Sequence, residues 1–131
     1  MFAHFTQGSN NLAQSIRFYD ALLAPLDITR RPSEDNSEIV CYQHPDKSAP
    51  GFFVVTPFNN NPATVGNGTM IAFSASSTTQ VDNCYRSGID NGGTNEGLPG
   101  PRPEYDEQYY GAYLRDPDGN KVHIVYRGTT A

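Results

Sequence analysis

The sequence has few basic residues, few cysteines and no long apolar runs, and each shortage argues against a class of protein. Its 131 residues include 9 Lys and Arg against 14 Asp and Glu, a formal net charge of -5. Nucleic-acid phosphates are bound by clustered Lys and Arg, and the longest basic run here is the pair Arg30-Arg31. No segment approaches the roughly 18 apolar residues of a membrane span, and none resembles a signal peptide. We therefore expect a cytoplasmic protein with no nucleic-acid or membrane partner.

The two cysteines, Cys41 and Cys84, each lie inside an apolar stretch. Such cysteines are typically small core residues, and their number alone does not indicate a disulfide. No neighbouring residue suggests a lowered thiol pKa, so neither is expected to act as a nucleophile. The apolar fraction is only 37%, but eight Tyr and seven Phe supply bulky side chains for a core or for the wall of a pocket.

The first half of the chain predicts the order strand, helix, strand, strand, strand. Ser9 or Asn10 can cap the helix, and Pro25 ends it because proline lacks an amide donor. Four apolar side chains recur between them at helical spacing, and turn-rich segments separate the later strands. The four side chains are Leu12, Ile16, Tyr19 and Leu23, and the predicted strands lie at residues 1–8, 28–31, 38–43 and 51–57.

The second half repeats this order after a Pro-, Asn- and Gly-rich linker at residues 59–68. Its helix is capped by Ser76, Ser77 or Thr78, and Gly88 is placed to end it. A displacement of 66 residues aligns His4 with Met70 and Tyr19 with Tyr85, which agrees with an internal repeat. Strands are predicted at residues 70–75, 109–115 and 121–127, whereas residues 91–105, rich in Gly and Pro, show only weak strand signals.

Four segments, taken in this order, resemble glyoxalase-like proteins of the vicinal oxygen chelate (glyoxalase/bleomycin resistance/extradiol dioxygenase) superfamily. They are the helix segment Phe18 to Leu26, Gly66-Asn67-Gly68 before a strand, Gly97 to Pro103 with Tyr105, and the turn Asp116-Pro117-Asp118-Gly119-Asn120. The resemblance implies an α+β fold of two paired βαβββ modules that form a curved sheet around a cleft. Residues 1–131 would then be a single domain, with modules at about 1–58 and 69–128.

The family's shared device is a divalent metal that chelates vicinal oxygens of the substrate as a Lewis acid. The resemblance places His4 and His123 at ligand positions, but it also places Met70 where the pattern usually has a histidine. Val54 stands where glyoxalase I has a carboxylate, and valine cannot ligate a metal. Zinc, nickel, manganese or iron would therefore bind weakly, and two hydrogen-bonded histidines in a metal-free pocket are slightly favoured.

The other candidate residues are predicted to surround the same cleft. Tyr113 matches a tyrosine that assists at the metal in family dioxygenases, although an aromatic residue packed in the sheet is the commoner alternative. Arg102 or Arg127 could pair with a carboxylate of the substrate, and the segment around Arg102 and Tyr105 could cover the cleft. The residues predicted to bind substrate are Val54, Met70, Arg102, Tyr105, Tyr109 and Arg127.

Two functions follow from these residues. In the first, the protein is a metal-assisted lyase or isomerase of a small oxygenated molecule, with His4 and His123 as ligands and Tyr113 as the catalytic residue. In the second, it binds or sequesters a small molecule without a metal, as some drug-resistance relatives do. The two histidines favour the first function, and Val54 and Met70 favour the second. The resemblance also implies a homodimer.

Overall fold

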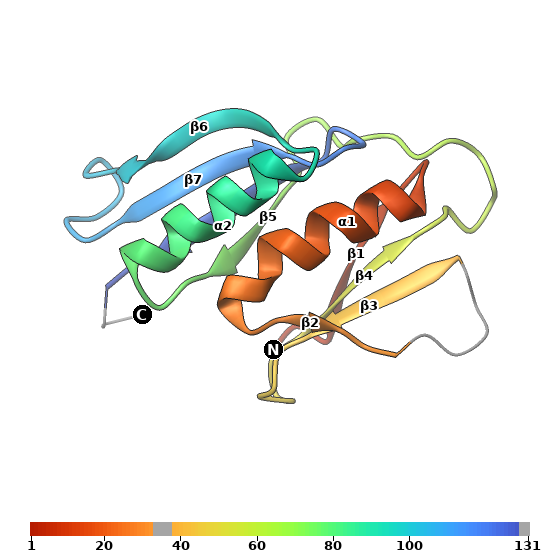
Figure 1. Cartoon of the computed structure of the whole chain (residues 1–131), viewed down its shortest axis with the longest axis horizontal. Coiled ribbons are helices and arrows are strands. Elements are labelled where there is room, and N and C mark those ends of the chain that lie inside the picture. The colour runs from red at the N-terminus through yellow and green to blue at the C-terminus, as the bar shows by residue number, and fades with distance from the viewer. Residues whose placement is uncertain (33–37, 129–131) are drawn as a thin grey trace.

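The computed structural model describes residues 1–32 and 38–128, which form two four-stranded sheets, each accompanied by a helix (Figure 1). In both sheets the first and fourth strands of the module run parallel and the remaining pairs are antiparallel. The predicted pair of βαβββ modules is therefore confirmed. The first sheet has the order β1-β4-β3-β2, and comprises β1 (His4–Gly8), β2 (Thr29–Arg30), β3 (Ile39–Gln43) and β4 (Gly51–Val55). The second has the order β5-β8-β7-β6, and comprises β5 (Met70–Ser74), β6 (Thr94–Pro101), β7 (Tyr110–Arg115) and β8 (Lys121–Tyr126). The helices are α1 (Leu12–Leu23), the short 3-10 helix η1 (Ala24–Leu26) and α2 (Thr78–Asp90).

Both helices begin at a side-chain cap. The side chain of Asn11 accepts a hydrogen bond from the backbone N–H of Gln14, and Ser77 does the same for Gln80. Ser77 is one of the three predicted caps, whereas the first helix begins one residue later than expected. Ser9 instead accepts the backbone N–H of Asn11, which fixes the chain just before the helix.

Gly88 lies inside α2 and does not end it, because the helix continues to Asp90. A β-carbon at Gly88 would lie 2.8 Å from a methyl group of Leu114 and 2.9 Å from one of Leu22. Leu22 and Gly88 are 66 residues apart, which is the displacement of the internal repeat, so they occupy equivalent positions in the two helices. A large side chain thus faces a glycine where α1 meets α2. The glycine therefore allows close packing between the helices.

The Gly- and Pro-rich segment that showed weak strand signals contains β6, a strand of eight residues. It pairs with β7, but its register shifts between Asn95 and Gly97 and again between Gly97 and Gly100. Glycine and proline are tolerated at bulges and at sheet edges, and β6 is an edge strand. These irregularities break the two-residue alternation by which a strand is recognised in a sequence.

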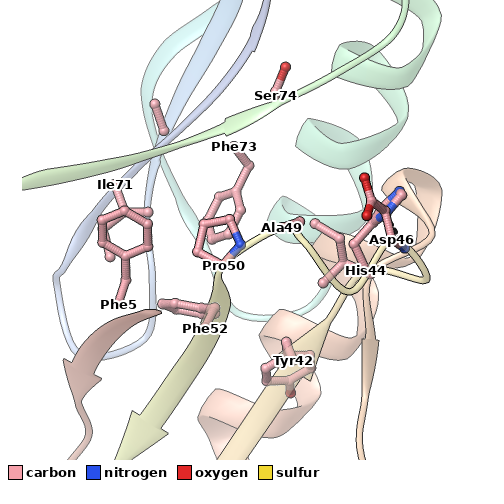
Figure 2. Close-up of a pocket in the computed structure, with 12 residues that line it drawn as sticks. Phe5, Tyr42, His44, Asp46, Ala49, Pro50, Phe52, Ile71, Phe73 and Ser74 are labelled. Carbon is pink, nitrogen blue, oxygen red and sulfur yellow. Dashed lines mark hydrogen bonds between the residues drawn. The ribbon is translucent and has the colours of Figure 1, made fainter. Parts of the chain in front are cut away.

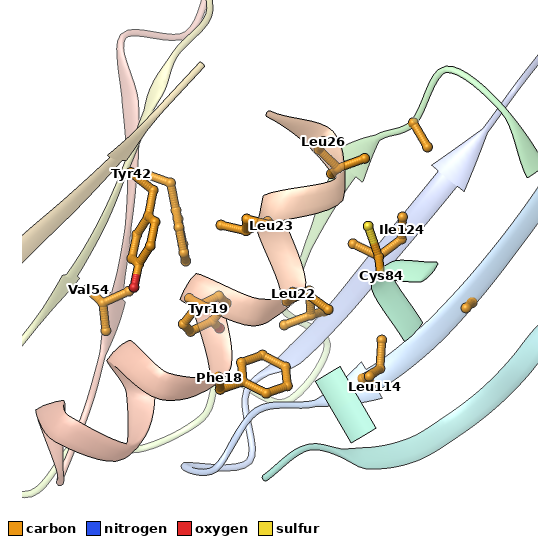
Figure 3. Packing of buried hydrophobic residues seen from close by; sticks show 14 of the residues in the cluster. Phe18, Tyr19, Leu22, Leu23, Leu26, Tyr42, Val54, Cys84, Leu114 and Ile124 are labelled. Atoms are coloured by element: carbon orange, nitrogen blue, oxygen red, sulfur yellow. The ribbon is translucent and has the colours of Figure 1, made fainter. Parts of the chain in front are cut away.

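The helices lie between the two sheets, and a single hydrophobic core joins the helices to both sheets (Figures 1 and 3). In α1, Tyr19 and Leu23 lie toward the first sheet, while Phe18 and Leu22 lie toward the second (Figure 3). The other face of each sheet therefore points away from the core. The buried strand residues of the core are Val40, Tyr42, Phe52 and Val54 in the first sheet and Ala112, Leu114, Val122 and Ile124 in the second.

The turn between β7 and β8 ties the second module to the first. Asp116 is only 4% exposed, and its carboxylate accepts hydrogen bonds from the hydroxyl of Tyr19 at 2.6 Å and from the side chain of Asn120 at 2.9 Å. Asp118, two residues on, accepts the hydroxyl of Ser15 at 3.0 Å. Tyr19 and Ser15 both belong to α1, so the Asp-Pro-Asp-Gly-Asn turn has a structural role as a tether. No helix in the part of the chain that the structure describes is long and apolar enough to cross a membrane.

Candidate functional site

The outward surface of the second sheet gathers most of the predicted site residues. Because Val122 and Ile124 of β8 point into the core, strand alternation turns Lys121, His123 and Val125 outward. Residues of β5 and β7 join them through the pairs Ala72 with His123 and Tyr113 with His123. We call this surface the His123 face. Its outward residues are Met70, Ala72, Ser74, Gly111, Tyr113, Arg115, Lys121, His123 and Val125, with Tyr109 and Arg127 at the strand ends.

Both ring nitrogens of His123 are hydrogen-bonded within the chain. Nδ1 lies 2.9 Å from the carbonyl oxygen of Ala112, which can only accept, so Nδ1 carries the proton. Nε2 is then an acceptor, and the hydroxyl of Tyr109 donates to it at 2.7 Å. Burial lowers the pKa of His123, and the nearby cations Arg102, Arg127 and Lys121 lower it further. The imidazole is therefore neutral at pH 7, in a fixed tautomer.

Tyrosine rings pack on and beside this imidazole. The ring of Tyr113 stacks on His123 with centroids 4.0 Å apart and planes at 5°, and Tyr109 lies at 5.8 Å and 19°. Tyr105 meets Tyr109 edge-on at 5.0 Å. Desolvation, with smaller effects of Tyr109 and Tyr105, raises the pKa of Tyr113 to about 12. Its phenol stays protonated at neutral pH and can donate a hydrogen bond, but it is a poor base.

Three cations lie near the faces of these tyrosines. Arg102 and Lys121 approach the ring centroid of Tyr113 at 5.7 Å and 5.2 Å, and Arg127 approaches that of Tyr109 at 5.7 Å. Arg102 also donates to the carbonyl groups of Leu98, Gly100 and Pro101, so it holds the end of β6 in shape. Strand alternation along β8 places Lys121 on the same face as His123. A pocket of about 450 Å³ on this face is lined by Met70, Tyr105, Asp106, Tyr109, Tyr113 and Arg127.

Two of the predicted site residues lie elsewhere. His4 is exposed on the outward face of the first sheet, where its ring meets Phe53 edge-on at 5.2 Å. His4 and Met70 therefore lie on separate sheets facing outward, so a cleft between them within one chain is not formed. Val54 is 1% exposed and lies in the core, because strand alternation turns Phe53 and Val55 outward instead. The prediction that Val54 contacts the substrate is therefore wrong.

The described residues of one chain do not bring together the ligands of a metal centre. His4 and His123 lie on different sheets, and the Nε2 of His123 is already engaged by Tyr109. Metal sites of the zinc type use three or four nitrogen, sulfur or carboxylate ligands. Among residues 1–32 and 38–128, no group of three or more His, Cys, Asp or Glu side chains is placed to hold an ion.

The class of the protein is defined by its paired βαβββ modules. In the second module, a histidine and several tyrosines lie on the outward face of a mixed sheet. The family model of the Glyoxalase/Bleomycin resistance protein/Dioxygenase superfamily matches residues 1–124. The chain belongs to this superfamily.

Solved structures agree with this assignment. A glyoxalase/bleomycin resistance protein from Albidiferax ferrireducens is 44% identical, with 97% of this chain and 98% of that chain covered and a TM-score of 0.85. A glyoxalase-related enzyme from Fulvimarina pelagi is 22% identical over 97% and 88% of the two chains, with a TM-score of 0.73. Lactoylglutathione lyase from Agrobacterium tumefaciens is 16% identical over 97% and 93%, with a TM-score of 0.65. These last two likenesses show the fold alone. No curated protein matches the sequence.

Proposed function

We propose that the His123 face binds a small, planar, anionic molecule without a metal. The observation that carries this proposal is the state of His123, whose two ring nitrogens are bonded to Ala112 and Tyr109 within the chain. An imidazole held in this way orients the tyrosines around it and is not free to ligate. This is the second of the two functions considered from the sequence.

The ligand class follows from the chemistry of the surface. The tyrosine rings offer flat faces on which a planar group can stack, and the exposed side chain of Arg127 can pair with a carboxylate. Lys121 adds a second positive charge beside Tyr113. The protonated hydroxyl of Tyr113 can donate to an oxygen of the ligand, which is the role that we assign to it. A chain with a net charge of -5 thus gathers cations where the ligand would bind.

We propose that a second copy of the chain covers this face. Met70 and Tyr105 are 41% and 62% exposed on it, so two large apolar side chains lie open to water in a single copy. Both β1 and β5 are edge strands, which leaves their outer backbone groups available at the rim. The outward face of the first sheet, with His4, is the complementary surface of the second copy. A homodimer in the cytoplasm is part of this proposal.

Calorimetric titration with naphthalene-2-carboxylate tests the binding site. We expect Arg127→Gln to weaken binding about 5- to 20-fold, because an ion pair with the carboxylate is lost. Met70→Trp should abolish binding by filling the pocket while the protein stays folded. Arg86→Gln, an exposed arginine on α2, is the matched control and should bind like wild type.

The same protein should then be titrated with Zn²⁺ and Ni²⁺. Stoichiometric, tight binding that is lost in His4→Ala and in His123→Ala would contradict the proposal. That result would favour the metal-assisted lyase or isomerase, with His4 supplied across a dimer interface.

A further inference from the structure

A second pocket lies between the two sheets (Figure 2). Its volume is about 370 Å³, within the range typical of sites for small molecules. Its walls include Phe5, Phe52 and Phe73 on the core-facing sides of the strands. Ala72 and Ser74 of the edge strand β5, which belong to the His123 face, also line it, whereas Tyr109, Tyr113 and Arg127 do not. The outward residues that bind the proposed anion are on the opposite side of the second sheet.

One side of this pocket is aromatic. Phe5, Phe52 and Phe73 lie together in Figure 2, and the rings of Phe52 and Phe73 meet edge-on with centroids 5.2 Å apart. These two rings come from different modules, so the pocket spans the junction between them. A ligand that covers this apolar wall removes apolar surface from water, which is favourable. The wall therefore favours a ligand with an aromatic body.

The other side is formed by the turn between β3 and β4, where His44 and Asp46 lie (Figure 2). The backbone N–H and the hydroxyl of Ser48 both donate to Oδ1 of Asp46, at 3.0 Å and 2.7 Å, which leaves Oδ2 for a ligand. These bonds lower the pKa of Asp46, so it is a carboxylate at neutral pH. The described residues that line the pocket include no Lys or Arg.

His44 completes this polar end in a defined form. The backbone N–H of Asp46 donates to its Nδ1 at 3.0 Å, so the neutral ring carries its proton on Nε2. The turn thus offers one carboxylate oxygen and one N–H group beside an aromatic wall. Lys47, the next residue in the chain, is exposed and is not among the residues that line the pocket, and a carboxylate attracts a positively charged group and repels an anion.

We propose that this pocket is a second binding site, which takes a small aromatic amine. Its ring would lie against Phe5, Phe52 and Phe73, and its ammonium group would pair with Asp46. The ligand would be opposite in charge to the one that the His123 face accepts.

Tryptamine is a suitable probe, because the chain contains no tryptophan and the indole fluorescence of the ligand can be followed directly. Fluorescence anisotropy titrations should compare tryptamine with tryptophol, its neutral analogue, and with indole-3-propionate. We expect tryptamine to bind at least tenfold more tightly than indole-3-propionate. Asp46→Asn should weaken tryptamine binding about three- to tenfold and leave tryptophol unchanged.

Two further variants locate the site. Ala49→Phe adds a ring at the rim of the pocket and should abolish tryptamine binding, whereas Met70→Trp on the His123 face is the control. Because Met70→Trp introduces a fluorophore, its binding is measured by calorimetry. Equal affinity for the amine and the acid, unchanged binding by Ala49→Phe, or no binding by wild type would each overturn the proposal. These results are independent of whether the His123 face binds an anion.

Discussion

The two modules share one strand topology but use the turn between their third and fourth strands in different ways. In the second module this turn buries Asp116, which is bonded to Tyr19 of α1. In the first module the equivalent turn carries Asp46, which is exposed and whose carboxylate accepts hydrogen bonds from Ser48 two residues away. One turn therefore serves as the tether between the modules, which leaves the other free to line a pocket.

The outward faces of the two sheets differ in the same sense. On the second sheet, His123 is 1% exposed beneath tyrosine rings and beside cations. On the first sheet, His4 is exposed at the start of an edge strand and contacts Phe53. Equivalent backbones thus carry a buried, hydrogen-bonded imidazole in one module and an exposed imidazole in the other.

The largest effect should come from breaking the tether. Asp116→Ala leaves the buried hydroxyl of Tyr19 and the amide of Asn120 without their partner, and we expect a loss of about 3–4 kcal/mol in the free energy of unfolding. Asp46→Ala at the equivalent turn should change the free energy of unfolding far less, because its carboxylate is exposed. Urea unfolding measures both. Similar costs for the two substitutions would show that the turns are not specialised.

The contact between the modules can be tested at Gly88. Alanine would normally stabilise a helix by about 1 kcal/mol relative to glycine. At Gly88 the added methyl group would collide with Leu22 and Leu114, so we expect a net loss of about 1–3 kcal/mol. Arg86→Ala, at an exposed position of the same helix, should change the free energy by less than about 0.5 kcal/mol. A stabilised Gly88→Ala variant would mean that the helices are further apart than described.

The hydroxyl of Tyr109 can be removed without disturbing its ring. Tyr109→Phe leaves the buried Nε2 of His123 without its donor, at an expected cost of about 1–2 kcal/mol. Tyr105→Phe removes a hydroxyl from a residue that is 62% exposed and should cost less than about 0.5 kcal/mol. Thermal unfolding of the two variants side by side gives the comparison. A neutral Tyr109→Phe would mean that this hydrogen bond does not hold the site.

A smaller effect concerns pH. Because the pKa of His123 is lowered in the folded state, the unfolded chain binds more protons near its ordinary pKa of 6.5. His123 therefore contributes stability that is present above about pH 6.5 and is lost as the pH falls toward its folded pKa, by at most about 1.4 kcal/mol per pH unit. His123→Gln should flatten the change of unfolding free energy between about pH 8 and pH 5.5. An unchanged slope in His123→Gln would refute the assignment.

Much of the fold could be predicted from the sequence, because its signals are local. Helical spacing at Leu12, Ile16, Tyr19 and Leu23 predicts the first helix, and the turn at residues 116–120 predicts the last pair of strands. The pairing of two βαβββ modules came from the resemblance to the superfamily, with which the order of elements agrees. β6 could not be recognised, since glycine, proline and two register shifts hide its alternation. Gly88 has the pattern of a helix end, and only the proximity of Leu22 and Leu114 shows why it lies inside α2.

The candidate site was predictable only in part. Alternation along β7 and β8 correctly grouped Tyr113 with His123, because residues two apart share a face. It could not show whether the outward faces of the two sheets meet, since that depends on how α1 and α2 pack between them. A difference of one residue along β4 is enough to move a side chain such as Val54 between the core and the opposite face, because each step along a strand reverses the face. The pocket beside Asp46 had no signal in the sequence, as its walls come from both modules.

The state of the His123 ring nitrogens tests the central claim most directly. Side-chain nitrogen-15 NMR of the labelled protein, with His123→Gln to assign the signals, reports which nitrogen is protonated and whether either binds a metal. We predict a neutral ring with its proton on Nδ1, a change in its signals on addition of naphthalene-2-carboxylate, and no change on addition of Zn²⁺. A large shift of the Nε2 signal with Zn²⁺ would contradict this account, because it would show a metal displacing Tyr109 from a site that we describe as metal-free.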